Sequence, residues 1–208
     1  PGGIPSLEGD FGPGGQDFGS YEGGADYGGA RDSSGNRGDF SGARDTGTGN
    51  YVESNPLEVP AYVSIVGDDQ RTVNVSPSTP TKDLFHVRKA TKLANMTFKD
   101  HLAPAAAVGF PTTEIAENVG GGAWKGPYIQ NCTSQTTTGT GIYIDGDQAR
   151  LLKAMNVDAF TQYNQGGIGV AVTNGGFAQL VSLFTICCNE AVKVDKGGQA
   201  DIANSNCS

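Results

Sequence analysis

The feature that most constrains this chain is an internal repeat of 22 positions near its C-terminus. The run VAVTNGGFAQLVSLFT (170–185) aligns with VKVDKGGQADIANSNCS (192–208). At this offset Val170 aligns with Val192, Ala178 aligns with Ala200, and the pair Gly175-Gly176 aligns with Gly197-Gly198. Each copy is typical of a short strand, a tight turn and a second short strand. Such a unit cannot bury its own apolar face, so successive copies must stack on one another.

Two earlier stretches have the same strand–turn–strand character. The run FHVRKATKLANMTFKD (85–100) has a turn at 89–91, and IYIDGDQARLLKAMNVDAFT (142–161) is a looser copy with a longer connection. The segment 147–155 is the best helical competitor, as a single short turn. A leucine-rich repeat would need its LxxLxL spacing, and a sandwich would need frequent hairpin turns. The sequence therefore predicts an all-β fold, a right-handed single-stranded parallel β-helix (β-solenoid) over residues 56–208.

The alternation of apolar residues predicts which side chains face the interior of this solenoid. We expect these inward positions to be Val63, Ile65, Phe85, Val87, Leu93, Met96, Phe98, Val170, Val172, Leu180, Val192 and Val194. Asn131, Asn204 and Asn206 lie near strand ends, where their amides either stack between coils or simply occupy polar turns. Both readings of these asparagines remain open.

Residues 1–55 form a different region, an extended Gly-rich arm. Half of the chain's 32 glycines fall within residues 1–50, and no helical or strand period is present there. Such a segment cannot bury enough apolar surface to offset the entropy of ordering it. We therefore expect it to dock on a partner protein. The predicted anchors are its spaced aromatic residues, Phe11, Phe18, Tyr21, Tyr27 and Phe40.

Charge and hydropathy exclude two kinds of partner. The chain has 22 acidic and 14 basic residues, a net charge of -8, which is unsuited to binding nucleic acid as the main ligand. No run of eighteen apolar residues is present, so we predict no membrane span. The chain begins at Pro1 and stops at Ser208 inside a patterned segment, which suggests part of a longer polypeptide.

Several long runs carry a family likeness. The runs AYVSIVGDDQRTVNVSPSTPTKDLFHV, NMTFKDHLAPAAAVGFPT, GPYIQNCTSQTTTGTGIYIDG, NVDAFTQYNQGGIGVAV and NGGFAQLVSLFTICC resemble the pectin-lyase-like β-helix region of virion structural proteins. These are proteins of marine contractile-tailed phages of the cyanophage type. The resemblance covers about 150 residues. It implies a tail, baseplate or tail-fibre component that is a homotrimer, located in the virion and in the host cytoplasm during assembly.

Catalysis on such a fold would need carboxylates gathered on one sheet face. The acidic candidates in the repeat are Asp145, Asp147, Asp158, Glu190, Asp195 and Asp201. Their spacing does not bring them together: Asp145 and Asp147 surround a turn glycine, and Glu190 and Asp195 flank an expected turn. His86 should point outward between two inward residues, and His101 is isolated. We therefore predict no catalytic residue and no enzymatic activity.

No cofactor or metal site is predicted either. The four cysteines, Cys132, Cys187, Cys188 and Cys207, form no CxxC pair and are expected to be buried free thiols. Trp124 lies in a Gly-rich loop, where it either contacts a glycan or a neighbouring subunit or serves as a buried anchor.

These observations favour a structural protein of a phage tail. Its arm would anchor to other tail or baseplate proteins, and its β-helix would serve as a spacer or scaffold. The alternative is a receptor-binding or polysaccharide-degrading tailspike that contacts host surface glycan. A cell-surface adhesin is a third, weaker possibility, because no signal peptide is visible.

Overall fold

The computed structural model describes residues 44–45, 47–111, 125–146 and 153–208, and these ranges are built from β-strands that form two parallel sheets. The larger sheet has eleven strands: β1 (Arg44–Asp45), β2 (Gly49–Glu53), β4 (Ser64–Val66), β5 (Val73–Pro77), β7 (Lys92–Lys99), β9 (Tyr128–Thr136), β11 (Ala154–Asn164), β13 (Phe177–Val181), β14 (Phe184–Ile186), β16 (Gln199–Ala203) and β17 (Asn206–Cys207). The smaller sheet has six: β3 (Leu57–Glu58), β6 (Phe85–His86), β8 (Ala106–Phe110), β10 (Thr140–Asp145), β12 (Ile168–Thr173) and β15 (Glu190–Val194).

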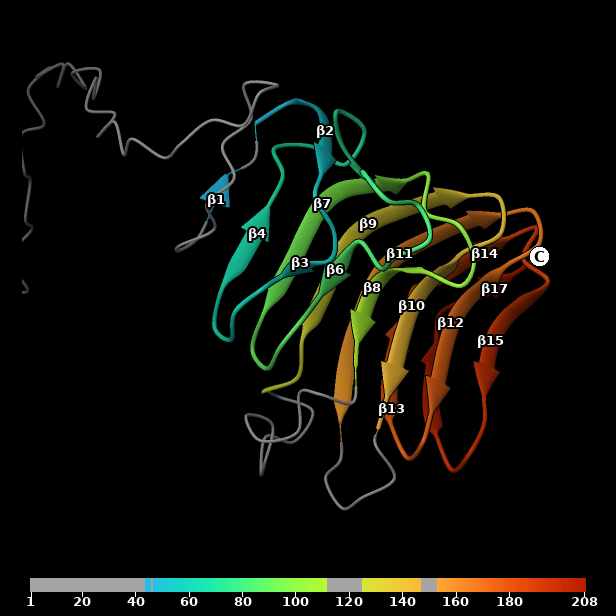
Figure 1. Cartoon of the computed structure of the whole chain (residues 1–208). Helices are drawn as coiled ribbons and strands as arrows, with labels where there is room; N and C mark the ends of the chain where they lie inside the picture. The colour runs from blue at the N-terminus through green and yellow to red at the C-terminus, as the bar shows by residue number, and fades with distance from the viewer. Residues whose placement is uncertain (1–43, 46, 112–124, 147–152) are drawn as a thin grey trace, which may run out of the picture.

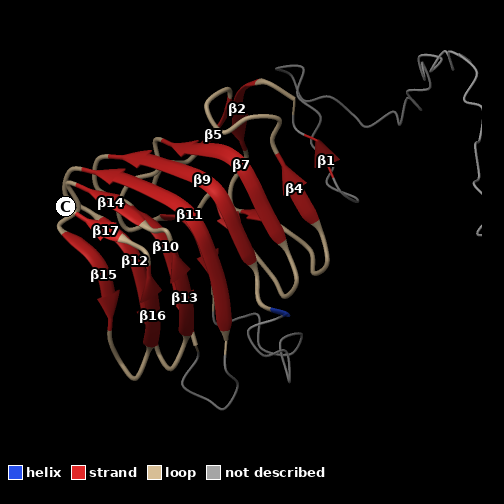
Figure 2. Ribbon diagram, turned by 180° about the vertical axis from the view of Figure 1, so that it is seen from behind, coloured by secondary structure: helices blue, strands red, loops and turns tan. Residues whose placement is uncertain are grey.

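The chain alternates between the two sheets and advances by one strand position each time it returns. It passes from β10 in the smaller sheet to β11 in the larger one, then back to β12 beside β10, and on to β13 beside β11. Figure 1 shows the two layers facing each other, with the chain progressing from β4 toward the C-terminus. Figure 2 shows the larger sheet from behind, with β7, β9 and β11 side by side. This arrangement is compatible with a β-solenoid.

The repeat predicted from the sequence coincides with the strand register. Val170 pairs with Val192, and Ala178 pairs with Ala200, both at the expected offset of 22 positions. Elsewhere the offset is longer: Leu93 pairs with Ile129, 36 positions later. The strands therefore keep their register while the connections between them vary in length, which explains why only the last two copies are easily aligned.

The core lies between the two sheets and runs along the whole stack. Most of the predicted inward residues are buried there: Ile65, Phe85, Val87, Leu93, Met96, Phe98, Val170, Val172 and Leu180. Val63 and Val192 are only partly buried but pack against this core. Val194 pairs in register with the buried Val172, so it faces the core side as predicted, yet it is 44% exposed. It lies on β15, the outermost strand of the smaller sheet, which pairs on one side only, with β12.

A column of residues in the left-handed conformation bends the strands of the larger sheet. Asn95, Asn131, Ala159, Ser182 and Asn204 all have φ between 49° and 56°. The register places them side by side on successive strand levels. Asparagine tolerates this conformation better than most residues do. We call these five residues the left-handed column.

Stacking between asparagines occurs in this column, as one of the two readings of the sequence predicted. The Asn131 Nδ2 donates to the Asn95 Oδ1 at 2.9 Å. The Asn204 Nδ2 instead donates to the Ser182 Oγ at 3.2 Å. Asn206 is exposed on β17, where its backbone pairs with Phe184.

The sheets begin earlier than the boundary predicted at residue 56. Strand β1 pairs with β4, and β2 pairs with β5, so residues 44–45 and 49–53 already belong to the stack. The predicted aromatic anchors of the arm, Phe11, Phe18, Tyr21, Tyr27 and Phe40, lie outside the described residues. So does Trp124. Within the described ranges, no helix has the length and apolar character needed to cross a membrane.

Candidate functional site

The outer surface of the smaller sheet carries the most organised set of polar side chains. One residue from each of its six strands falls at the same level of the register, so that the six form a line across the sheet. We call this line the transverse row; its members, in spatial order, are Glu58, His86, Gly109, Tyr143, Ala171 and Lys193. The row has charged or titratable side chains at both ends, and Gly109, Tyr143 and Ala171 lie between them.

At the N-terminal end of the row, His86 lies between two carboxylates. Its Nδ1 is 2.8 Å from the Glu58 Oε1, and its Nε2 is 3.0 Å from the Asp83 Oδ2. The other oxygen of Asp83 accepts a hydrogen bond from the backbone N–H of Ala106 at 2.7 Å. These contacts join three successive levels of the stack. We call Glu58, His86 and Asp83 the carboxylate clasp.

The clasp favours the charged form of the imidazole. The pKa of His86 is raised above its usual 6.5, mainly by the hydrogen bond to Asp83. Burial lowers it, while the hydrogen bond and charge of Glu58 raise it further. Both ring nitrogens face acceptor oxygens, so the doubly protonated ring satisfies both contacts. The prediction that His86 points out of the core is confirmed.

Gly109 is the neighbour that makes room for the clasp. It pairs with His86 on one side and with Tyr143 on the other. A Cβ atom at this position would lie 2.8 Å from the Asp83 Oδ2 and 3.2 Å from the His86 Cδ2. Any larger residue would therefore push the carboxylate and the imidazole out of their present positions.

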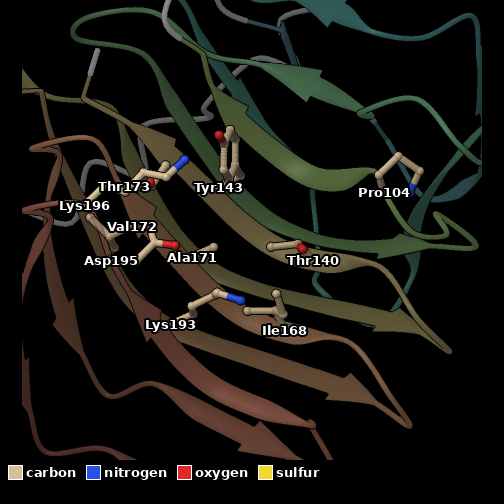
Figure 3. A pocket seen from close by; sticks show the side chains of 10 residues that line it. All are labelled: Pro104, Thr140, Tyr143, Ile168, Ala171, Val172, Thr173, Lys193, Asp195 and Lys196. Carbon is tan, nitrogen blue, oxygen red and sulfur yellow. The ribbon is translucent and has the colours of Figure 1, made fainter. Parts of the chain in front are cut away.

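The other end of the row lines a shallow groove of about 270 Å³ (Figure 3). Ala171 forms part of its floor, between Tyr143 on β10 and Lys193 on β15. Pro104 and Ile168 add apolar surface, and Thr140, Thr173, Asp195 and Lys196 add polar groups around it. The groove therefore combines an aromatic ring, small apolar surface and hydroxyl, ammonium and carboxylate groups.

Hydrogen bonds hold the polar wall of this groove. The Tyr143 hydroxyl donates to the Asp145 Oδ2 at 3.1 Å, and the Asn174 Nδ2 donates to the Asp145 Oδ1 at 2.9 Å. The pKa of Tyr143 is raised to about 12, first by burial and then by the charge of Asp145. Tyr143 therefore keeps its proton at ordinary pH and serves as a neutral hydrogen-bonding group.

The acidic residues that we considered for catalysis are held in separate contacts. Asp158 accepts a hydrogen bond from the Tyr128 hydroxyl at 3.1 Å. Glu190 pairs with Lys193 at 3.3 Å. These two contacts lie on different sheets, and Asp147 lies outside the described residues. Glu190 is the first residue of β15 and Asp195 follows its last, so a strand rather than a turn separates them, which corrects that detail of the prediction.

His101 is a second histidine with an environment opposite to that of His86. It is completely buried, and burial lowers its pKa to about 4. Its Nε2 faces the Ser134 Oγ at 3.5 Å. Ser134, Gln162 and Thr185 follow one another in register, so a polar strip runs through this part of the interior.

The cysteines are free, but only one matches the prediction of a buried thiol. Cys132 is fully buried in the core, and burial raises the pKa of its thiol to about 12. Cys188 is partly buried, whereas Cys187 and Cys207 are exposed at the C-terminal end of the stack. The prediction of burial was wrong for these two: Cys207 lies on β17, which pairs with β14 only, and Cys187 follows β14 in the left-handed conformation, with φ of 60°. Across the described ranges, no group of three His, Cys, Asp or Glu side chains could hold a metal ion.

Sequence reasoning singled out His86 but missed both of its partners. Glu58 precedes His86 by 28 positions, a coil length different from the 22 of the recognised repeat. Asp83 is three positions from His86, a spacing that does not indicate proximity in a strand. One signal could have indicated that Glu58 lies beside His86: Leu57-Glu58 and Phe85-His86 share an apolar–polar pattern.

Comparison with known proteins provides no relative: no protein family, curated protein or solved structure matches this chain. A function can therefore be inferred from two sources only. One is the geometry of the described residues, and the other is the resemblance of the runs quoted above.

Proposed function

We propose that this chain is a structural protein of a phage tail, as a baseplate or tail-fibre component. In this proposal the described residues from 44 to 208 form a right-handed parallel β-helix that serves as a spacer or scaffold. The N-terminal arm binds neighbouring tail proteins through Phe11, Phe18, Tyr21, Tyr27 and Phe40. The protein is a homotrimer in the virion and is present in the host cytoplasm during assembly.

The observation that carries this proposal is the continuous parallel stack with a core running along its length. Each level is hydrogen-bonded to the next, which suits a rod that must resist bending and shear. Right-handedness is supported by the strong general preference for right-handed connections between parallel strands. The tail location is supported by the resemblance of several long runs to virion β-helix proteins.

Removal of residues 1–43 tests the proposal, because the stack begins at β1. The truncated protein should keep the far-UV circular dichroism spectrum and cooperative melting of the full chain. It should also fail to enter particles when it replaces the full-length protein during assembly. A second variant keeps the full chain but replaces the five arm aromatics by serine. It should also be excluded from particles. Normal incorporation of both variants would contradict the proposal.

A second candidate function is binding of host surface glycan, as in a receptor-binding or polysaccharide-degrading tailspike. The groove of Figure 3 favours it, because Tyr143, Ala171 and the polar groups beside them offer both stacking surface and hydrogen bonds to a sugar. Host polysaccharide titrated onto the isotope-labelled protein should shift the amide signals of β10, β12 and β15. The Ala171→Arg variant, which fills the groove floor, should abolish these shifts. An unchanged spectrum of the wild-type protein would exclude this function for the described residues.

A further inference from the structure

The carboxylate clasp lies where the smaller sheet is most weakly paired. Strand β3 is the edge of this sheet, and β6 is its neighbour there. The two strands share only two residue pairs, Leu57 with Phe85 and Glu58 with His86. The backbone N–H groups of Leu57 and Val59 donate to the carbonyls of Leu84 and His86, at 2.8 and 2.9 Å. Just before β3, the Asn55 side chain donates to the carbonyls of Thr79, Lys82 and Asp83. Across the paired residues themselves, the contact between Glu58 and His86 is the side-chain hydrogen bond that joins the two strands.

The geometry of the clasp requires two donors on one ring. A carboxylate accepts hydrogen bonds and does not donate them at neutral pH, so each of the two contacts needs an N–H on the imidazole. A neutral imidazole has a single N–H. Loss of the proton to solvent therefore leaves one ring lone pair facing a carboxylate oxygen, at 2.8 or 3.0 Å. That contact then changes from attraction to repulsion.

The two charged side chains that contact His86 are both acidic. Strand β3 contributes Glu58, and the segment before β6 contributes Asp83. Strand β8 places Gly109, which has no side chain, at the paired position, and the next strand places Tyr143 there. Along its own segment, Lys82 precedes Asp83 and Arg88 follows His86 by two positions.

We propose that the carboxylate clasp is a pH-sensitive lock that fastens strand β3 to the rest of the stack. It is closed while the imidazole of His86 carries a proton on both nitrogens, and it opens when one of these protons is lost. The opened state frees the backbone of residues 57–59 without unfolding the sheet beyond β6. The lock follows from the described contacts and does not depend on the tail function.

The direction of the pH dependence follows from the raised pKa of His86. A group whose pKa is higher in the folded than in the unfolded protein stabilises the fold fully below its unfolded pKa, near 6.5. This stabilisation is lost as the pH rises through the raised, folded value. The lock is therefore closed in mildly acidic solution and opens toward alkaline pH.

Titration of the full chain by NMR, together with hydrogen exchange, tests this lock. The His86 ring should titrate above 6.5, and the Leu57 and Val59 amides should lose protection by about fivefold between pH of about 6 and about 8.5, after correction for intrinsic exchange. His101 is the only other histidine, and burial lowers its pKa to about 4, so it does not titrate in this range.

Three substitutions separate the lock from a merely structural role. His86→Gln should give low protection of Leu57 and Val59 that no longer changes with pH. His86→Arg, which keeps several donors at every pH, should give protection that persists to alkaline pH. Glu58→Gln should move the His86 pKa down toward 6.5 while leaving the fold intact, because Glu58 is 53% exposed. A His86 pKa of 6.5 or less in the wild-type protein would overturn the proposal. So would an equal pH dependence of the two amides in His86→Gln.

Discussion

Ala159 is the one member of the left-handed column that should be improved by substitution. It has φ of 52°, in a region that costs an alanine about 1–2 kcal/mol relative to its preferred conformations. Its side chain is exposed, so a larger residue meets no core atom. The register places it directly beside Asn131, whose amide already donates to Asn95 on the level before.

Ala159→Asn should therefore stabilise the protein by about 1 kcal/mol, because asparagine tolerates this conformation and can extend the amide stack to Asn131. Ala159→Gly relieves the same strain but increases the entropy of the unfolded chain, so a smaller gain of about 0.5 kcal/mol is expected. For a domain of this size, the gain for asparagine corresponds to a rise in melting temperature of about 2–4 °C.

Thermal and urea unfolding, followed by circular dichroism, measure these gains. The matched control is Ala203→Gly, at an exposed position of β16 that is not left-handed, where glycine should destabilise by about 0.5–1 kcal/mol. The reasoning fails if Ala159→Gly and Ala203→Gly lower the stability by the same amount. It also fails if Ala159→Asn melts no higher than the wild-type protein.

Three further predictions concern the interior and the turns, and each is checked by the free energy of unfolding in urea. Phe160→Ala should lower the free energy of unfolding by about 3–5 kcal/mol, because Phe160 is fully buried. A loss no larger than that of an alanine substitution at an exposed position would contradict its place in the core. Gly141→Ala should destabilise by more than about 2 kcal/mol, since its Cβ would overlap the buried Gln162 side chain and lie 2.6 Å from the Gly169 carbonyl oxygen. Gly175→Ala should destabilise by only about 1 kcal/mol, because its Cβ would meet open space and only the φ of 78° disfavours alanine. Equal losses of stability at Gly141 and Gly175 would refute this distinction.

Much of the fold was predictable because strand register follows local pattern. The alignment of Val170 with Val192 and of Ala178 with Ala200 is the pairing found in the sheets. Alternation of apolar and polar residues likewise identified nearly all of the proposed core, since successive strand side chains point to opposite faces. Both signals depend on residues that are neighbours in sequence or separated by a constant offset.

The exposure of residues at the end of the stack and the left-handed column were less predictable from the sequence. Val194 has the same pattern as Val172, yet it is exposed because its strand lies at the edge of the sheet. Cys207 is exposed on β17, which pairs with β14 only, whereas Cys187 is exposed where the chain bends after β14. Ala159 has no sequence feature that indicates a left-handed conformation; its place in register with Asn131 and Ser182 imposes it.

The sequence alone thus determined the strands, their parallel repeat and the apolar faces that force them to stack. The tertiary structure decided which polar groups meet. Glu58 meets Asp83 and His86 because the connection from β3 to β6 returns the chain beside Glu58 after 28 positions. Gly109 matters only because it lies beside that meeting point. Local pattern fixes which face a side chain takes, whereas contact between distant side chains depends on how far each connection lets the chain advance before it pairs again.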